Sequence, residues 1–188
     1  MQLATHELRD LSELIAGCYN TINTMSTYIQ QAQDPELKQL LQQHFPLHVQ
    51  DYNLKVEFVQ SQSEPNIDKF QPSKLTPVLS SYLKTPVEEL PPVTPNVSGA
   101  PPNDRAIATG YLLNQKSSAL NYAGAVLECA NPNLRTFLEN AFLNSGRHAY
   151  DVWQYMVKKG YYPLSQAPES EIQTLANIYQ PVNQSFQQ

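Results

Sequence analysis

The chain has 188 residues, of which 41% are hydrophobic and 15% are charged, and its formal net charge is −5. A chain of this length builds one domain, or one domain with an extension. The negative charge gives no support for binding nucleic acid or an anionic membrane. Six glycines and few β-branched runs favour helices over strands, and two cysteines do not make a disulfide framework.

The opening residues, MQLATHELRD, contain neither the basic block nor the apolar block of a secretory signal. No apolar run in the chain approaches the roughly 20 residues that a membrane-spanning helix needs. We therefore expect cytoplasmic synthesis and no membrane span.

The first hundred residues begin with two expected helices, over 5–32 and 35–60. Because only 33–34 separate them, they should be antiparallel neighbours. Pro46 falls inside the second helix, where it should produce a kink. Residues at helical spacing in the first helix are expected to face inward: Leu8, Leu11, Ile15, Cys18, Ile22, Met25 and Ile29.

The segment 61–103 is expected to be a crossover, because it holds nine of the fifteen prolines. Such a density of proline excludes a core helix or a central strand and favours an extended strap. A short helical turn over 73–83 remains compatible with the spacing of its apolar residues. A flexible linker between two separate hairpins is the alternative interpretation.

Two further helices are expected over 104–129 and 132–159, with Asp104 as the cap of the first and Asn131-Pro132 starting the second. Gly160 should end the second helix. The inward stripe of the second helix should comprise Leu134, Phe137, Leu138, Phe142, Ala149, Trp153 and Met156. Residues 1–163 should form one unit, followed by a tail, 164–188, with a weak helix over 169–179.

The two halves of the chain resemble each other at an offset of 97 positions. Asp34-Pro35 corresponds to Asn131-Pro132, and the apolar stripes that follow each pair coincide. We interpret this as an internal repeat of a helical hairpin, with chance similarity of amphipathic helices as the competing explanation. Together the elements predict an all-α, antiparallel four-helix bundle made of two hairpins.

The second half also resembles the Coat F domain, the family of spore coat protein F. The resemblance rests on an ordered set of residues between Asp104 and Pro163: Asp104-Arg105, Leu112-Leu113-Asn114, Lys116, Tyr122-Ala123, Glu128, Asn131-Pro132, Leu134-Arg135, His148, Tyr155-Met156 and Gly160-Tyr161-Tyr162-Pro163. The first half fits only as a diverged copy. The resemblance implies a ferritin-like bundle, a role in sporulation and a location in the spore coat after synthesis in the mother cell.

A ferritin-like bundle invites a search for metal ligands on facing helices. His48-x-x-Asp51 and His148-x-x-Asp151 each place two ligand types one helical turn apart. The order is opposite to the Glu-x-x-His pattern of di-iron bundles, and neither of the other two helices offers a carboxylate at that level. The sequence therefore predicts no metal and no cofactor, and these histidines are interpreted as surface or structural groups.

The leading functional hypothesis is a non-catalytic structural protein of the spore coat whose partners are other coat proteins, with a possible homodimer. Its eleven tyrosines and its many glutamines would suit cross-linking. The first alternative is a ferritin-like metal-dependent oxidase that uses His48, Asp51, His148 and Asp151. The second is an adaptor that binds a partner helix. Cys18 and Cys129 are expected to be buried and unpaired within one chain.

Overall fold

The computed structural model describes residues 3–60, 63–76 and 92–182, and over these residues it contains helices and no strand. The long helices are α1 (Thr5–Gln31), α2 (Pro35–Gln60), α4 (Asp104–Glu128) and α5 (Pro132–Lys158), with a single turn, η1 (Ile67–Lys69), and a short helix, α6 (Glu169–Ile178). Helices α1, α4 and α5 each end one residue before the expected boundary. In the part of the chain so described, none of the helices has the length and apolar content that crossing a bilayer requires.

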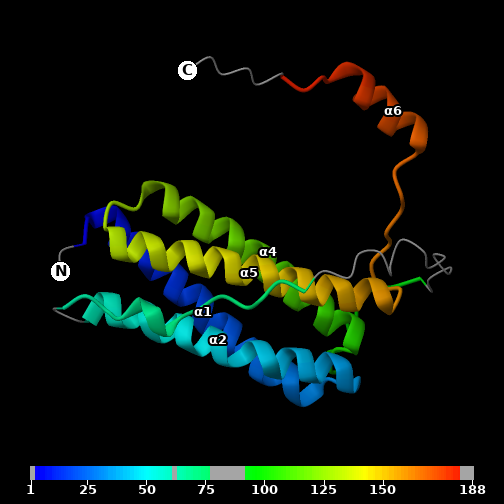
Figure 1. The fold of residues 1–188 in the computed structure, drawn as a ribbon. Helices are drawn as coiled ribbons and strands as arrows, with labels where there is room; N and C mark the ends of the chain where they lie inside the picture. The colour runs from blue at the N-terminus through cyan, green and yellow to red at the C-terminus, as the bar shows by residue number, and fades with distance from the viewer. Residues whose placement is uncertain (1–2, 61–62, 77–91, 183–188) are drawn as a thin grey trace.

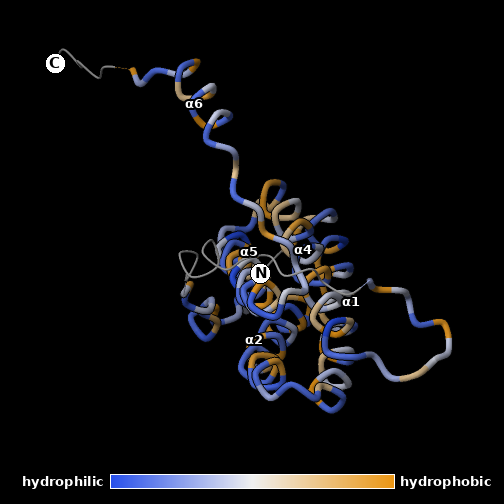
Figure 2. Tube along the Cα trace, turned by 90° about the vertical axis from the view of Figure 1, so that its right-hand side faces the viewer, coloured by the Kyte–Doolittle hydropathy of each residue, from blue (hydrophilic) through white to orange (hydrophobic). Residues whose placement is uncertain are grey.

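The four long helices pack side by side as two hairpins. Helix α1 packs against α2 and helix α4 against α5, and the hairpins meet through contacts of α1 with α4 and of α2 with α5. Figure 2 looks along the helices and shows the four of them around a common centre. Each long helix can therefore bury an apolar stripe against two neighbours, which a single hairpin could not provide.

Polar side chains fix where three of the helices begin. The Asp34 carboxylate accepts a bond from the N–H of Glu36 (2.9 Å), and the Asn131 side chain accepts one from the N–H of Leu134 (2.9 Å). Helix α4 is capped by Asn103 and not by Asp104, so that expectation was wrong. The Asn103 side chain accepts a bond from the first turn of α4, which leaves the Asp104 carboxylate available for other contacts.

The carboxylate of Asp104 closes the turn of the opposite hairpin. Its two oxygens accept bonds from the backbone N–H groups of Gln33 (2.9 Å) and Asp34 (3.1 Å), which form the turn between α1 and α2. These N–H groups would otherwise lack a partner at the end of one helix and the start of the next. The second hairpin thus stabilises the turn of the first.

Glu7, near the start of α1, makes the reciprocal contact. Its Oε1 accepts bonds from the N–H groups of Ala130 (2.8 Å) and Asn131 (2.7 Å) in the turn between α4 and α5. Glu7 and Asp104 are separated by 97 positions, and so are the two turns that they close. The offset read from the sequence therefore relates positions with the same contacts in both hairpins.

Replacing Glu7 by Gln is expected to lower the free energy of unfolding by about 1–3 kcal/mol, because a buried charged acceptor of backbone bonds is removed. Burial alone would raise the pKa of Glu7, but the N–H groups of Asn131, Ala4 and Ala130 together hold it below its usual value. A carboxyl with a lowered pKa stabilises the fold above the pKa of the unfolded chain, about 4.3, and that contribution is lost as the pH falls through and below this value. Urea titrations at pH 7 and below pH 4 measure both effects.

The matched control for this prediction is Glu13→Gln, which removes the same charge from an exposed position of the same helix. It should change the free energy of unfolding by less than about 0.5 kcal/mol. Equal losses in the two variants would contradict the closing role of Glu7.

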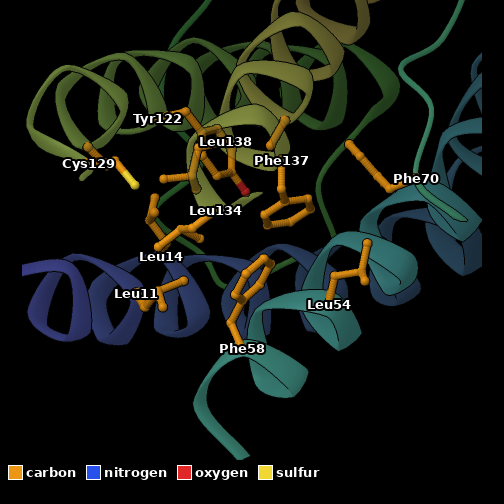
Figure 3. Packing of buried hydrophobic residues seen from close by; sticks show 12 residues of the cluster. Leu11, Leu14, Leu54, Phe58, Phe70, Tyr122, Cys129, Leu134, Phe137 and Leu138 are labelled. Carbon is orange, nitrogen blue, oxygen red and sulfur yellow. The ribbon is translucent and has the colours of Figure 1, made fainter. Parts of the chain in front are cut away.

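The apolar core lies in two clusters at opposite ends of the four helices. Figure 3 shows the first, in which the rings of Phe58 and Phe137 stack with centroids 5.7 Å apart and share the cluster with Leu134 and Leu138. The second includes Leu37 and Leu41 and the other residues of its cluster: Met25, Ala32, Ile107, Ala108, Tyr111, Leu112, Val152, Tyr155 and Met156. Both hairpins contribute to both clusters, so neither hairpin has a core of its own.

Residues 63–76, the first described part of the connection between the hairpins, run along α5 (Figure 1). Phe70 is fully buried and packs edge-on against Phe137, with ring centroids 5.6 Å apart. Ser73 donates its N–H to Asn144 (3.0 Å). Residues 73–76 are not helical, and the rest of the turn considered over 73–83 lies outside the described residues. The segment 63–76 thus fills the space over α2 and α5.

Two inward positions expected from the sequence were wrong. Leu8 and Phe142 are exposed, at 48% and 41% of their surface. In α1 the buried stripe passes through Glu7 and Thr21, both polar, because Glu7 bonds to the α4–α5 turn and the Thr21 hydroxyl bonds to Asn114 (3.1 Å). These contacts rotate α1 relative to the orientation that its apolar residues alone predict.

Candidate functional site

A layer of buried polar side chains separates the two apolar clusters. We call it the polar layer, and it draws on all four long helices and comprises Cys18, Thr21, His44, His48, Asp51, Lys55, Gln115, Asn144, Ser145 and His148, together with the hydroxyl groups of Tyr111 and Tyr122. Buried polar groups are costly unless they are bonded to one another. The hydrogen bonds and ion pairs within this layer must therefore offset the cost of burying its polar groups.

The hydroxyl of Tyr111 is the hub of the layer. His44 Nδ1 and His48 Nε2 each lie 3.0 Å from it, and His148 Nδ1 lies at 3.4 Å. His48 Nε2 and His148 Nδ1 are also 3.1 Å apart. We call His44, His48 and His148 the histidine cluster. One hydroxyl from α4 thus joins two imidazoles of α2 to one of α5.

In His44 and His148, the ring nitrogen that does not face Tyr111 has a partner closer to the surface. His148 Nε2 lies 2.9 Å from the hydroxyl of Ser73, and His44 Nε2 lies 3.3 Å from a carboxylate oxygen of Asp151. A cleft of about 440 Å³ reaches His44 and Asp151 from the surface between α2 and α5, and it is also lined by Glu36, Gln39, Leu40, Gln43, Thr76, Gln154 and Tyr155. Solvent can therefore approach the cluster through His44.

Two members of the histidine cluster are held in the neutral form. Burial lowers the pKa of His48 to about 4, with the neighbouring His44 acting in the same direction. Burial and the two other imidazoles lower the pKa of His148 well below its usual value. Around neutral pH these rings therefore exchange hydrogen bonds as uncharged groups.

Asp51 and Lys55 form a buried ion pair one turn further along α2. Lys55 Nζ lies 2.6 Å from Asp51 Oδ2, and Lys55 has no exposed surface. Tyr122 donates its hydroxyl to the same carboxylate oxygen (2.6 Å), and Lys55 also contacts that hydroxyl (2.6 Å) and Cys18 Sγ (2.9 Å). Asp51 Oδ1 is buried and has no bond to the residues described.

The charges around Lys55 and Cys18 leave these two side chains little reactivity. Burial alone would lower the pKa of Lys55, but the Asp51 carboxylate raises it above its usual value, so the amine stays protonated. Burial and Asp51 raise the pKa of Cys18 to about 11. Neither the amine nor the thiol is in the nucleophilic form near neutral pH. The geometry is that of a structural ion pair.

The four residues considered as metal ligands do not converge on one point. His48 and His148 meet, but Asp51 is turned to Lys55 and Asp151 to His44. The His44 and His148 rings stack at 3.7 Å with planes 6° apart, so their in-plane lone pairs run parallel and cannot meet on a single ion. Within the described ranges, no group of three or more His, Cys, Asp or Glu side chains is arranged to hold a metal.

Sequence reasoning missed the groups that organise the layer. Tyr111 and Tyr122 stand at helical spacing among the apolar residues of α4 and so look like plain core residues, although each brings a hydroxyl into the core. Lys55 was not considered, although Asp51 and Lys55 stand at the i, i+4 spacing of a helical ion pair. That spacing, next to the apolar residues Leu54 and Phe58, was the sequence signal for a buried ion pair.

The comparisons with known proteins agree with the resemblance noted in the sequence. Residues 103–165 match the Coat F domain. Helices α4 and α5, and with them Tyr111, Tyr122 and His148, lie inside this domain, whereas His48, Asp51 and Lys55 lie outside it. The polar layer is therefore completed by the half of the chain that precedes the Coat F domain.

Two individual proteins resemble the whole chain and not only its Coat F domain. The spore coat protein F-like protein YhcQ of Bacillus subtilis is 24% identical over 182 residues, which cover 94% of this chain and 80% of that protein. A crystal structure of a protein from Bacillus halodurans, described as a candidate spore coat protein, superimposes with a TM-score of 0.66 at 13% identity. The superposition covers 90% of this chain and 97% of that one, and it shows a shared fold.

Proposed function

We propose that the protein is a structural component of the bacterial spore coat and acts by assembly with other coat proteins, not by catalysis. The observation that carries the proposal is the Coat F domain at residues 103–165, which a relative named as spore coat protein F-like extends to nearly the whole chain. Synthesis in the mother cell followed by deposition on the spore would bring it to its place of action.

The chemistry of the polar layer supports a structural role. Its amine is paired and protonated, its thiol has a raised pKa, and two of its imidazoles are neutral and bonded to a shared hydroxyl. A catalytic site needs a nucleophile, base or metal poised to meet a substrate. The layer instead links all four long helices and so specifies how the two hairpins meet.

We further propose that residues 1–163 form a ferritin-like bundle derived from a duplicated hairpin, with 164–188 as a tail. The matching contacts of Glu7 and Asp104, 97 positions apart, support the duplication. The packing of four long helices, with residues 63–76 of the connection lying along α5, supports the bundle. Duplication explains why the Coat F domain corresponds to one hairpin, while the stable core needs two.

The test is the location of the protein in sporulating cells of its source organism. We expect the full-length protein in the coat extract of mature spores and not in the decoated spore interior. A cytoplasmic enzyme followed in the same fractions controls for contamination. Recovery of the protein only with that enzyme, at every stage of sporulation, would overturn the proposal.

The variant Tyr111→Phe separates assembly from catalysis. It removes the hydroxyl that joins the histidine cluster but keeps the ring in the core, so it should fold with reduced stability. A structural role predicts normal coat deposition of this variant whenever it is folded. A folded variant that reaches the coat but reproduces the phenotype of a deletion strain would favour a catalytic use of the histidine cluster.

A further inference from the structure

Helix α6 carries an apolar face that no described part of the chain covers. Every residue from Glu169 to Ile178 is exposed, and Figure 1 shows the helix projecting away from the four long helices. Ile172, Leu175 and Tyr179 follow one another at helical spacing on one face, and they are 45%, 56% and 74% exposed. A helix of about three turns is marginal in water without a packing partner. We therefore expect the apolar face of α6 to pack against another surface.

The outer face of α4 offers such a surface. Leu113, Leu120 and Leu127 are all exposed, at 59%, 74% and 75%, and they recur every seven residues. Seven residues are close to two helical turns, so the three side chains form one row with a spacing of about 10.5 Å. We call this row the leucine ladder. Beside its last member lies an apolar recess of about 190 Å³ lined by Ala123, Val126, Leu127, Glu139 and Phe142.

The two surfaces match in spacing and charge. Ile172 and Tyr179 are seven residues apart, as are Leu120 and Leu127. With the helices parallel and these pairs aligned, the acidic first turn of α6, at Glu169, comes beside Lys116, the exposed cation one turn before Leu120. The antiparallel orientation would instead place Glu169 opposite Ala130, two positions from the like charge of Glu128. Charge therefore selects the parallel register.

The chain leaves α5 beside Lys116, at the start of its own ladder, and α6 then projects away from it (Figure 1). Gly160 turns the chain at a φ of 71°, and the two tyrosines that follow are held against the body. The Tyr162 ring lies 5.3 Å from Lys116 Nζ and packs edge-on against Trp153. Pro163 and Pro168 then restrict the backbone of the link to α6. The apolar face of α6 and the ladder belong to one chain but do not meet in it.

We propose that α6 of one copy docks, parallel to α4, on the leucine ladder of a second copy. A contact between two different surfaces of identical copies can repeat without closing, so it builds open chains. The inference rests on the proposed assembly role. It names one contact through which copies of the protein would assemble. The two remain separable, because a protein can reach the coat through other partners while this contact is absent.

Cysteine pairing between purified full-length proteins tests the contact. One sample carries Leu120→Cys and the other Ile172→Cys, both at exposed positions, while the native Cys18 and Cys129 remain buried. After mixing and mild oxidation, we expect a disulfide-linked pair whose joined peptides contain positions 120 and 172. The control mixes Ile172→Cys with Asn53→Cys, an exposed position on α2, and should give at least tenfold less of the linked pair.

Three results would overturn the proposal. The first is the absence of the 120–172 link both in the mixture and in a double variant, a single chain that carries Leu120→Cys and Ile172→Cys together. The second is a link that forms only within single chains of the double variant, which would mean that α6 folds back on its own ladder. The third is an equal yield with Asn53→Cys, which would mean random collision.

The oligomeric state gives an independent measurement. Sedimentation of the unmodified protein should show association that increases with concentration. Leu175→Asp places a charge on the apolar face of α6 and should shift the protein to the monomer, whereas Gln173→Asp adds the same charge to the opposite face and should leave association unchanged. A protein that is monomeric at every concentration, or equal effects of the two variants, would contradict docking between copies.

Discussion

Replacing Lys55 by Met should lower the free energy of unfolding by about 3–5 kcal/mol, the cost of leaving one charge of a buried pair alone. Lys55 is fully buried, and its Nζ lies 2.6 Å from Asp51 Oδ2. Methionine has a similar length and would keep most of the packing against Phe137. The loss would therefore report the unpaired Asp51 carboxylate, and urea unfolding at pH 7 measures it.

Two further variants make this expectation specific to the ion pair. Asp51→Leu combined with Lys55→Met removes both charges and should recover most of the lost stability. Lys158→Met removes an exposed lysine paired with Glu36 at 2.8 Å and should cost less than about 1 kcal/mol. A double variant as unstable as Lys55→Met alone would show that shape, not charge, dominates at this position.

The free energy of unfolding should fall by roughly 3 kcal/mol through His48 alone as the pH is lowered from about 6.5 to 4. Burial lowers the pKa of His48 from 6.5 to about 4. Below pH 6.5 the unfolded chain binds a proton that the folded chain does not, so stability is lost as the pH falls. Each unit of pKa difference corresponds to about 1.4 kcal/mol. His148, whose pKa is also lowered, acts in the same direction.

Urea titrations at a series of pH values measure this dependence, and His48→Gln should flatten it. Glutamine can still bond to the hydroxyl of Tyr111 but does not titrate. Asn53 is exposed on the same helix as His48 and does not titrate, so Asn53→Gln should leave the pH dependence unchanged. If both variants keep the full dependence, the acid sensitivity arises from carboxylates such as Glu7.

The positions of the helices were accessible from the sequence because their signals are local. Asn131-Pro132 starts α5 and Gly160 ends it, and both act through neighbouring backbone groups. The orientation of α1 was not accessible in the same way. Glu7 points inward because of N–H groups more than 120 positions away, and no local pattern contains that information. Asp104 likewise bonds to N–H groups 70 and 71 positions away in the α1–α2 turn, which hid the choice of Asn103 as the cap of α4.

The polar layer was hard to predict for a related reason. A tyrosine in an apolar stripe is ordinarily a core residue, and the ring of Tyr111 is one; its hydroxyl acquires a role only when three imidazoles from two other helices surround it. The sequence did single out His48, Asp51, His148 and Asp151. It could not show that Asp51 turns to Lys55 and Asp151 to His44.

The reciprocal contacts of Glu7 and Asp104 have a consequence for how the chain can evolve. Each hairpin supplies the acceptor that the other needs, so the protein behaves as a dimer whose two halves happen to be tethered. Residues 63–76 of the tether also pack into the core through Phe70, whereas residues 92–103 serve only to keep the halves together. Its exposed stretch, residues 92–103, can therefore lengthen at a cost of only about 0.6 kcal/mol per doubling. Relatives of this protein should differ in length there more freely than at either turn.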